Sequence, residues 1–129
     1  MFIKKKIILF QLCACLLLFS LTACTSTADQ VQPPVEQSNI RGTVTKIEGD
    51  RIFVEEDPNE QTVSAKADIE LGSDTKYYIK QKAGYQEGKK TDINQGKTVD
   101  VWFTGITKDS FPLEAKASHV VVDLTSENK

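Results

Sequence analysis

Ala115-Lys-Ala-Ser-His-Val-Val-Val-Asp-Leu124 reads as one β-strand that is apolar on both of its faces. Successive side chains of a strand point to opposite sides, so the run from Val120 to Val122 places valine on each side. Strands covered on both faces occur in the core of a barrel or a sandwich. We therefore predict a mainly β domain that contains residues 115–124 as a central strand.

The segment from Thr98 to Thr104 alternates with the two-residue period of a half-buried strand. Asp100 and Trp102 are expected to point outward. The inward side is expected to carry the apolar residues Val99, Val101 and Phe103.

Four further strands are expected upstream, around residues 40–45, 51–55, 63–67 and 75–80. Gly49-Asp50 provides the turn between the first two, which makes them a hairpin. Residues 81–97 are rich in glycine and charge, and we expect a single helical turn there around Ile93. About five or six short strands without a long helix predict a small antiparallel OB-like barrel, with a small β-sandwich as the alternative.

The first residues carry the three parts of a secretory signal peptide. A basic cluster, Lys4 to Lys6, is followed by an apolar run from Ile7 to Leu21 and by Leu21-Thr22-Ala23-Cys24. This tetrapeptide resembles the bacterial lipobox, in which the cysteine becomes the lipid-modified first residue of the mature chain. We expect residues 1–23 to be a lipoprotein signal peptide and Cys24 to carry the lipid; an uncleaved membrane anchor is the alternative.

A diacylglyceryl group on Cys24 supplies two acyl chains, which suffice for stable attachment to a membrane. The expected location is the extracytoplasmic face of the cell membrane, in a cell of Gram-positive type. Residues 24–38 are polar, contain Pro33-Pro34 and lack an apolar period, so we expect a disordered tether. The β domain is expected over residues 39–125, followed by a tail at 126–129.

Charge and cysteine content exclude several classes of function. The chain has a net charge of −2, and removal of the leader takes away Lys4 to Lys6 but no acidic residue. Nucleic acid is excluded as a partner because phosphate binding depends on clustered Lys and Arg. Cys24 is the single cysteine of the mature chain, so neither a disulfide nor a zinc site is expected, and no cofactor or other metal is predicted.

Four aromatic residues are the candidate contacts to a ligand or partner: Trp102, Phe111, Tyr78 and Tyr85. Aromatic side chains displayed from a small barrel can stack on a sugar, a peptide or a partner protein. The alternative is that Trp102 closes the barrel and that Phe111-Pro112 plugs its end.

Catalytic groups are weaker candidates. His119 is the single histidine, and a histidine on a strand is more often packed or at an edge than catalytic. A triad of His119 with Ser110 and either Asp109 or Asp123 lacks a nucleophile-elbow motif. The acidic turn at residues 55–60 lacks the spacing of a calcium-binding loop.

The expected function is that of a non-catalytic binding module for an extracytoplasmic protein or an envelope glycan. One alternative is an envelope hydrolase that uses two carboxylates such as Asp100 and Glu114, which glycoside hydrolysis requires within ~5–10 Å of each other. The other is a structural or immunity-type accessory protein.

Three segments resemble the YobA-like DUF3221 family of small secreted or lipid-anchored proteins of Bacillus type: Ile40 to Val44, Gly96 to Phe103, and Asp109 to Ala117. The most specific part is Ser110-Phe111-Pro112, where the family tends to have Ser-Tyr-Pro. Phe111 stands in place of that tyrosine and lacks its hydroxyl group. The resemblance covers most of residues 39–124 and implies a fold but no particular chemistry.

Overall fold

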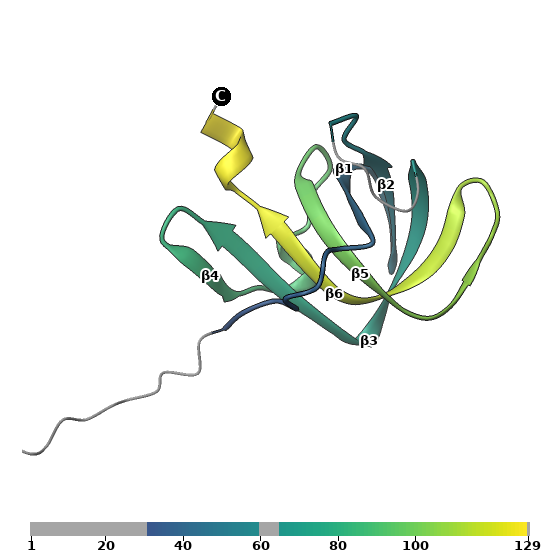
Figure 1. Ribbon diagram of the computed structural model, residues 1–129, viewed down its shortest axis with the longest axis horizontal. Coiled ribbons are helices and arrows are strands. Elements are labelled where there is room, and N and C mark those ends of the chain that lie inside the picture. Colours follow the sequence, from purple (N-terminus) through teal and green to yellow (C-terminus); the bar gives the residue numbers. More distant parts are fainter. Residues whose placement is uncertain (1–30, 60–64, 129) are drawn as a thin grey trace, which may run out of the picture.

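The computed structural model describes residues 31–59 and 65–128 (Figure 1). The strands are β1 (Ile40–Glu48), β2 (Arg51–Glu56), β3 (Lys66–Gln81), β4 (Gly84–Glu87), β5 (Thr98–Lys108) and β6 (Leu113–Asp123). Two short 3-10 helices, η1 (Lys90–Asp92) and η2 (Thr125–Asn128), complete the described elements. No helix in these two ranges is both long and apolar enough to cross a membrane.

The sheet closes into a barrel. Its strand order is β2-β1-β5-β6-β3-β4, and an additional pairing of β2 with β3 joins the ends. β4 extends the sheet beyond this closed five-stranded ring, as the teal hairpin in Figure 1 shows. The predicted OB-like barrel is thus confirmed, with the difference that β3 and β6 pair in parallel while the other pairs are antiparallel.

The inward side chains fill the barrel. Val99 and Val101 are fully buried, as the alternation of residues 98–104 predicted, and Val120 and Val122 of β6 are at most 1% exposed. Phe103 is only partly buried and packs against the edge of this core. The remaining buried aliphatic residues of the core are Ile40, Val44, Ile52, Val54, Ala67, Ile69, Leu71, Ile93, Leu113, Ala115 and Ala117.

β3 is the longest strand, and it replaces two predicted ones. Its first part, Lys66 to Glu70, pairs with β2, and its last part, Tyr78 to Gln81, pairs with β4. An irregularity between Leu71 and Lys76 adjusts the register with β6. The Thr75 hydroxyl bridges this irregularity by donating to the Ala117 carbonyl at 2.8 Å and accepting from the Gly72 amide at 2.9 Å.

Two expectations for residues 81–97 were wrong. β4 is a strand within a segment that was expected to contain none, because the backbone of residues 84–87 pairs with β3 regardless of side-chain pattern. The helical turn lies at Lys90–Asp92, one turn before the predicted position, and Ile93 ends it and enters the core. The predicted strand residues 63 and 64 lie outside the described residues.

Gly42 marks a place where two strands approach each other closely. It lies in β1 between its register partners Glu56 in β2 and Val99 in β5. A Cβ atom at this position would lie 2.0 Å from the Glu55 carbonyl oxygen. Glycine is therefore required here by space, since the carbonyl belongs to backbone that cannot move aside without loss of the β1–β2 pairing.

Residues 31–39, which we call the strap, run along the outside of the barrel before β1 begins. In Figure 1 the strap is the dark blue segment that passes across β6. Its last residue is held by β5, because the Asn39 amide donates to the Val101 carbonyl at 2.9 Å and the Asn39 side chain accepts from the Phe103 amide at 2.8 Å. Contacts to the barrel extend upstream of the predicted domain boundary at residue 39, and the first part of the predicted tether lies outside the described residues.

Candidate functional site

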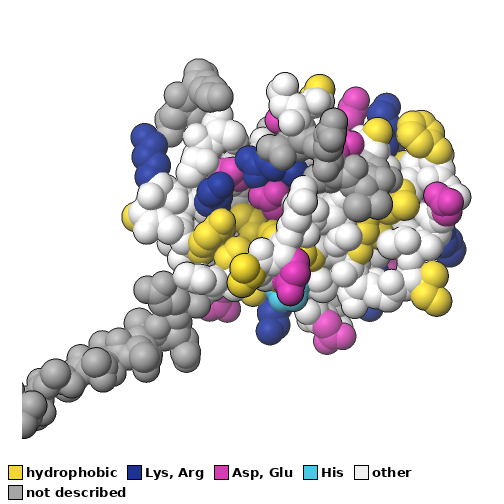
Figure 2. Space-filling model, viewed as in Figure 1, with side chains coloured by type: hydrophobic (Ala, Val, Ile, Leu, Met, Phe, Trp, Pro, Cys, Tyr) yellow, Lys and Arg dark blue, Asp and Glu magenta, His cyan; other side chains and the backbone are white. Residues whose placement is uncertain are grey.

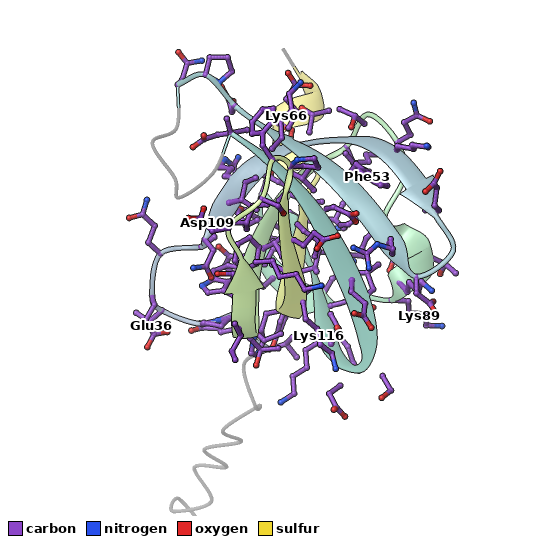
Figure 3. The ribbon with its side chains drawn as sticks, turned by 90° about the vertical axis from the view of Figure 1, so that its right-hand side faces the viewer. Glu36, Phe53, Lys66, Lys89, Asp109 and Lys116 are labelled. Carbon is purple, nitrogen blue, oxygen red and sulfur yellow. The ribbon has the colours of Figure 1, made fainter. Side chains whose placement is uncertain are left out.

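Trp102 projects outward from β5, and its indole is partly covered by the strap. The indole Nε1 donates to the backbone carbonyl of Glu36 at 2.8 Å. Figure 3 labels Glu36 at the lower left, on the segment that leads into the barrel. The barrel core is complete without Trp102, so the prediction of an outward tryptophan fits better than the alternative in which it closes the barrel.

His119 lies directly across from Trp102 because of a bulge in β6. Trp102 pairs with His119 whereas Phe103 pairs with Ala117, which leaves Ser118 as an extra residue. The Ser118 hydroxyl donates to the Trp102 carbonyl at 3.1 Å and is 2.9 Å from His119 Nδ1. A bulge shifts the alternation of side chains, so His119 faces outward although Ala117, two residues earlier, faces the core.

His119 also contacts Tyr78 of β3. The two rings are nearly parallel, with an interplanar angle of 18° and centroids 6.0 Å apart. Burial and the positive charge of Lys76 lower the pKa of His119 from its ordinary value of 6.5. The imidazole is therefore predominantly neutral at pH 7.

Trp102, His119 and Tyr78 thus form a row across β5, β6 and β3, which we call the aromatic face. Two of these residues were predicted contacts. The histidine between them was not among the predicted contacts, because alternation in a strand without a bulge would place it on the same side as Ala117.

The other two predicted contacts lie elsewhere. Tyr85 is on β4, opposite Lys80 of β3, and is 40% exposed. Phe111 is 79% exposed in the loop between β5 and β6, next to a cis peptide bond with Pro112. Trp102 and this loop are separated by the outer part of β5, which is about 20 Å long at 3.3 Å per residue. Phe111 therefore does not join the aromatic face.

An open groove of about 420 Å³ adjoins the aromatic face. Val31 and Gln32 of the strap form one side, and the β3 segment from Thr75 to Tyr78 forms much of its lining together with Glu87 and Gly88. Burial raises the pKa of the Tyr77 hydroxyl above its ordinary value, so that this phenol stays neutral. The groove combines ring surface with a few polar groups, a combination that ligand-binding clefts share.

Next to the aromatic face, Arg41 connects two carboxylates. Its Nη1 lies 2.5 Å from Asp100 Oδ2, and its Nη2 lies 2.7 Å from Asp123 Oδ2. Ser38 of the strap donates to the other Asp100 oxygen at 3.1 Å, and Lys80 Nζ is 3.6 Å from Asp123. Figure 2 shows basic and acidic side chains gathered beside hydrophobic surface on this side, with the histidine in cyan.

Asp123 is the most enclosed member of this charge network, with 1% of its side chain exposed. Burial raises the pKa of its carboxyl group, but hydrogen bonds from Thr125 and Arg41 and the charge of Lys80 outweigh burial and lower the pKa to about 2. Thr125 contributes both its backbone amide, at 2.9 Å, and its hydroxyl. Asp123 is therefore ionised at every physiological pH and ties η2 to the barrel.

The candidate carboxylate pair is not assembled. Asp100 lies opposite Val121, whereas Glu114 lies at the other end of β6, opposite Lys108. Seven strand residues at about 3.3 Å each separate the two levels by roughly 20 Å, well beyond the separation that glycoside hydrolysis needs. Asp100 is moreover paired with Arg41, and Glu114 lies 3.6 Å from Lys108 Nζ.

The candidate triad is not assembled either. Ser110 belongs to the β5–β6 loop, where its hydroxyl donates to the Pro112 carbonyl at 2.8 Å. His119 instead contacts Ser118, and Asp123 is engaged by Arg41 and Thr125. Within residues 31–59 and 65–128, no group of three or more His, Cys, Asp or Glu side chains is arranged to hold a metal ion.

Sequence similarity to known proteins indicates the family of this chain. The model of a family described as "Protein of unknown function (DUF3221)" matches residues 41–122. Neither the curated proteins nor the solved structures include a match to this chain. The matched segment begins at the second residue of β1, ends one residue before the end of β6, and spans well over half of the chain. The protein therefore belongs to the DUF3221 family.

Proposed function

We propose that the protein is a lipid-anchored surface protein whose barrel serves as a non-catalytic binding module for a protein or glycan of the cell envelope. The observation that carries this proposal is the aromatic face, with Trp102, His119 and Tyr78 in one row beside an open groove. The rings lie outside the barrel core, so core packing does not account for them.

The sequence of the leader supports the location. Lys4 to Lys6, the apolar run and Leu21-Thr22-Ala23-Cys24 follow one another in the order of a lipoprotein signal. A lipid on Cys24 would tether the strap, which begins at Val31. The intervening segment spans at most about 25 Å at ~3.5 Å per residue, so the aromatic face would be held close to the membrane surface.

The chemistry of the aromatic face supports binding and not catalysis. Tryptophan and tyrosine offer a large rigid contact area at a small cost in conformational entropy, and each carries a polar group that can orient a ligand. His119 is held neutral, and among the described residues the group within hydrogen-bond distance of its Nδ1 is the Ser118 hydroxyl, not a carboxylate that would make it a stronger base. Asp100, the acidic group closest along β5, is neutralised by Arg41.

The test is ligand retention by the immobilised full chain in mild detergent. Two arms use solubilised envelope proteins and purified cell-wall glycan from the same cells. The double variant Trp102→Ala/Tyr78→Ala should lose the retained ligand, whereas Phe111→Ala should keep it because Phe111 lies outside the aromatic face. Circular dichroism checks that all three proteins are folded. Equal retention by the double variant and the unmodified chain would contradict the proposal.

A further inference from the structure

The strap contacts the aromatic face in the way that a bound peptide would. The Trp102 indole donates to a backbone carbonyl, that of Glu36, at 2.8 Å. A carbonyl acceptor is present in every peptide, so this hydrogen bond does not depend on the Glu36 side chain. The strap enters on the other side of the face, where Val31 and Gln32 line the groove with Tyr78.

The path between these two contacts crosses the centre of the aromatic face. Gln32 lines the same groove as Tyr78, and the Glu36 carbonyl accepts the hydrogen bond of the Trp102 indole. His119 lies between those rings, stacked on Tyr78 and paired with Trp102. The connecting residues must therefore pass over or beside the histidine.

The connecting residues include two prolines that are less exposed than their neighbours. Pro33 and Pro34 are half-buried, whereas the next residue, Val35, is 99% exposed. Proline fixes its own φ angle and favours the polyproline II conformation in the residue before it. A Pro-Pro pair is thus pre-ordered in an extended form and loses little entropy when it docks.

Aromatic grooves that bind extended proline-containing peptides are a recurrent recognition mode. Its components are rings that pack against the proline rings and a side-chain donor that reaches a peptide carbonyl. The aromatic face provides the rings of His119 and Tyr78 and the donor of Trp102. The ligand carbonyl and the prolines are, in this chain, those of the strap itself.

We propose that the aromatic face recognises extended proline-containing peptide segments and that residues 31–36 occupy it in cis as a competing ligand. This inference rests on the proposed binding function and specifies the ligand as a segment of a partner protein. Asn39 is held to β5 by two hydrogen bonds and marks the point about which the strap would turn away. A tethered segment acts at an effective concentration of about millimolar, so a partner must outcompete it.

The experiment titrates a synthetic peptide with the sequence of residues 29–38 into two forms of the full chain in mild detergent. One form is unmodified, and the other, which we call the strap variant, carries Pro33→Ser and Pro34→Ser to weaken docking of the strap. Trp102 is the single tryptophan, so its fluorescence reports binding at the site. The peptide should bind the strap variant at least about tenfold more tightly than the unmodified chain, because competition in cis is reduced.

Two controls connect the binding to the aromatic face. A peptide in which both prolines are replaced by serine should bind the strap variant at least about tenfold more weakly than the original peptide does. Adding Trp102→Phe to the strap variant should also weaken binding of the original peptide severalfold, as measured by calorimetry, since the indole donor is lost. Phe111→Ala in the same background should change nothing.

Three results would overturn the inference. They are absence of peptide binding to the strap variant, equal affinity for the strap variant and the unmodified chain, and insensitivity to the peptide prolines. If the peptide does not bind while a cell-wall glycan is retained through Trp102 and Tyr78, the inference that the ligand is a peptide is wrong and the proposed binding function stands. If the peptide binds but no envelope ligand depends on these residues, the site is a peptide site and the wider function is wrong.

Discussion

The barrel has two outer surfaces that differ in what covers them. The covered face is the outward side of β5, β6 and the end of β3, with Asp100, Trp102, His119 and Val121, and the strap lies on it. The open face is the outward side of β1 beyond Arg41, of β2 and of the start of β3. Figure 3 labels Phe53 and Lys66 of the open face at the upper right and top, away from Glu36 of the strap.

Val121 and Phe53 illustrate the difference. Val121 points outward beside Asp100 and Tyr78, yet it is 1% exposed and lies apart from the barrel core. Phe53 is only half-buried on the open face, where Lys46 Nζ lies 5.5 Å from its ring centroid. Of these two outward residues, the one on the covered face is thus fully buried and the one on the open face is only half-buried.

Removal of an ion pair should show the largest difference in lost stability between the covered face and the open face. Asp123→Ala is expected to lower the free energy of unfolding by about 3 kcal/mol, because Arg41 and Lys80 lose a carboxylate that is 1% exposed. The matched change on the open face is Asp68→Ala, which removes a 2.8 Å pair with the 38% exposed Arg51. It should cost less than about 1 kcal/mol. Urea unfolding measures the free energy of unfolding of both variants, and equal losses would contradict the expected difference between the faces.

The same aspartate predicts an acid dependence. The pKa of Asp123 is lowered from 3.8 to about 2 in the folded protein, so its ionised form stabilises the fold fully above about pH 4. That contribution, about 2 kcal/mol, should be lost as the pH falls through 2. In Asp123→Asn this loss of stability at low pH should be absent. Unfolding free energies measured from pH 5 to 1.5 should therefore converge for the two proteins, and parallel curves would show that Asp123 is not the group responsible.

Truncation of a buried and of an exposed apolar residue should show the next largest difference in lost stability. Val121→Ala removes buried methyl groups from the covered face and should cost about 2 kcal/mol. Ile106, which is 95% exposed on the outer part of β5, is the matched control, and Ile106→Ala should change stability by less than about 0.5 kcal/mol. Thermal and urea unfolding measure both changes. A loss below about 0.5 kcal/mol for Val121→Ala would mean that this face is open to water in solution.

The hydrogen bond between Trp102 and Glu36 should give the smallest effect. Trp102→Phe keeps an aromatic ring but removes the indole donor, and we expect a loss of about 1 kcal/mol. Tyr85→Phe, which removes a hydroxyl on the exposed strand β4, serves as the control and should be neutral. If both variants are neutral, the contact with Glu36 does not contribute to stability.

Period-two alternation predicted the inward side of β5, where Val99 and Val101 face the core and Phe103 is partly buried against it. It also signalled, through Val121, that the other side of β6 is covered. It did not identify the cover, because the strap has no apolar period and is recognised only by its contacts.

The sequence pattern could not predict ion pairs between distant residues or changes in the register of the strands. Arg41 reaches Asp100 and Asp123 across 59 and 82 residues of chain, which no local spacing encodes. The bulge at Ser118 reverses the side on which His119 lies and so brings it between Trp102 and Tyr78. Two of the four aromatic residues predicted as contacts therefore lie on one face, and the histidine that joins them was not among the predicted contacts.

Solvent exchange of the Trp102 indole proton reports directly on whether the strap covers this face. The chain has one tryptophan and hence one indole N–H resonance in its NMR spectrum. In the full chain this proton should exchange slowly because it is bonded to Glu36, and Pro33→Ser/Pro34→Ser should speed its exchange while the amide of Val101 stays protected. An indole proton that exchanges as fast as that of free tryptophan in the unmodified chain would contradict a strap that covers the aromatic face.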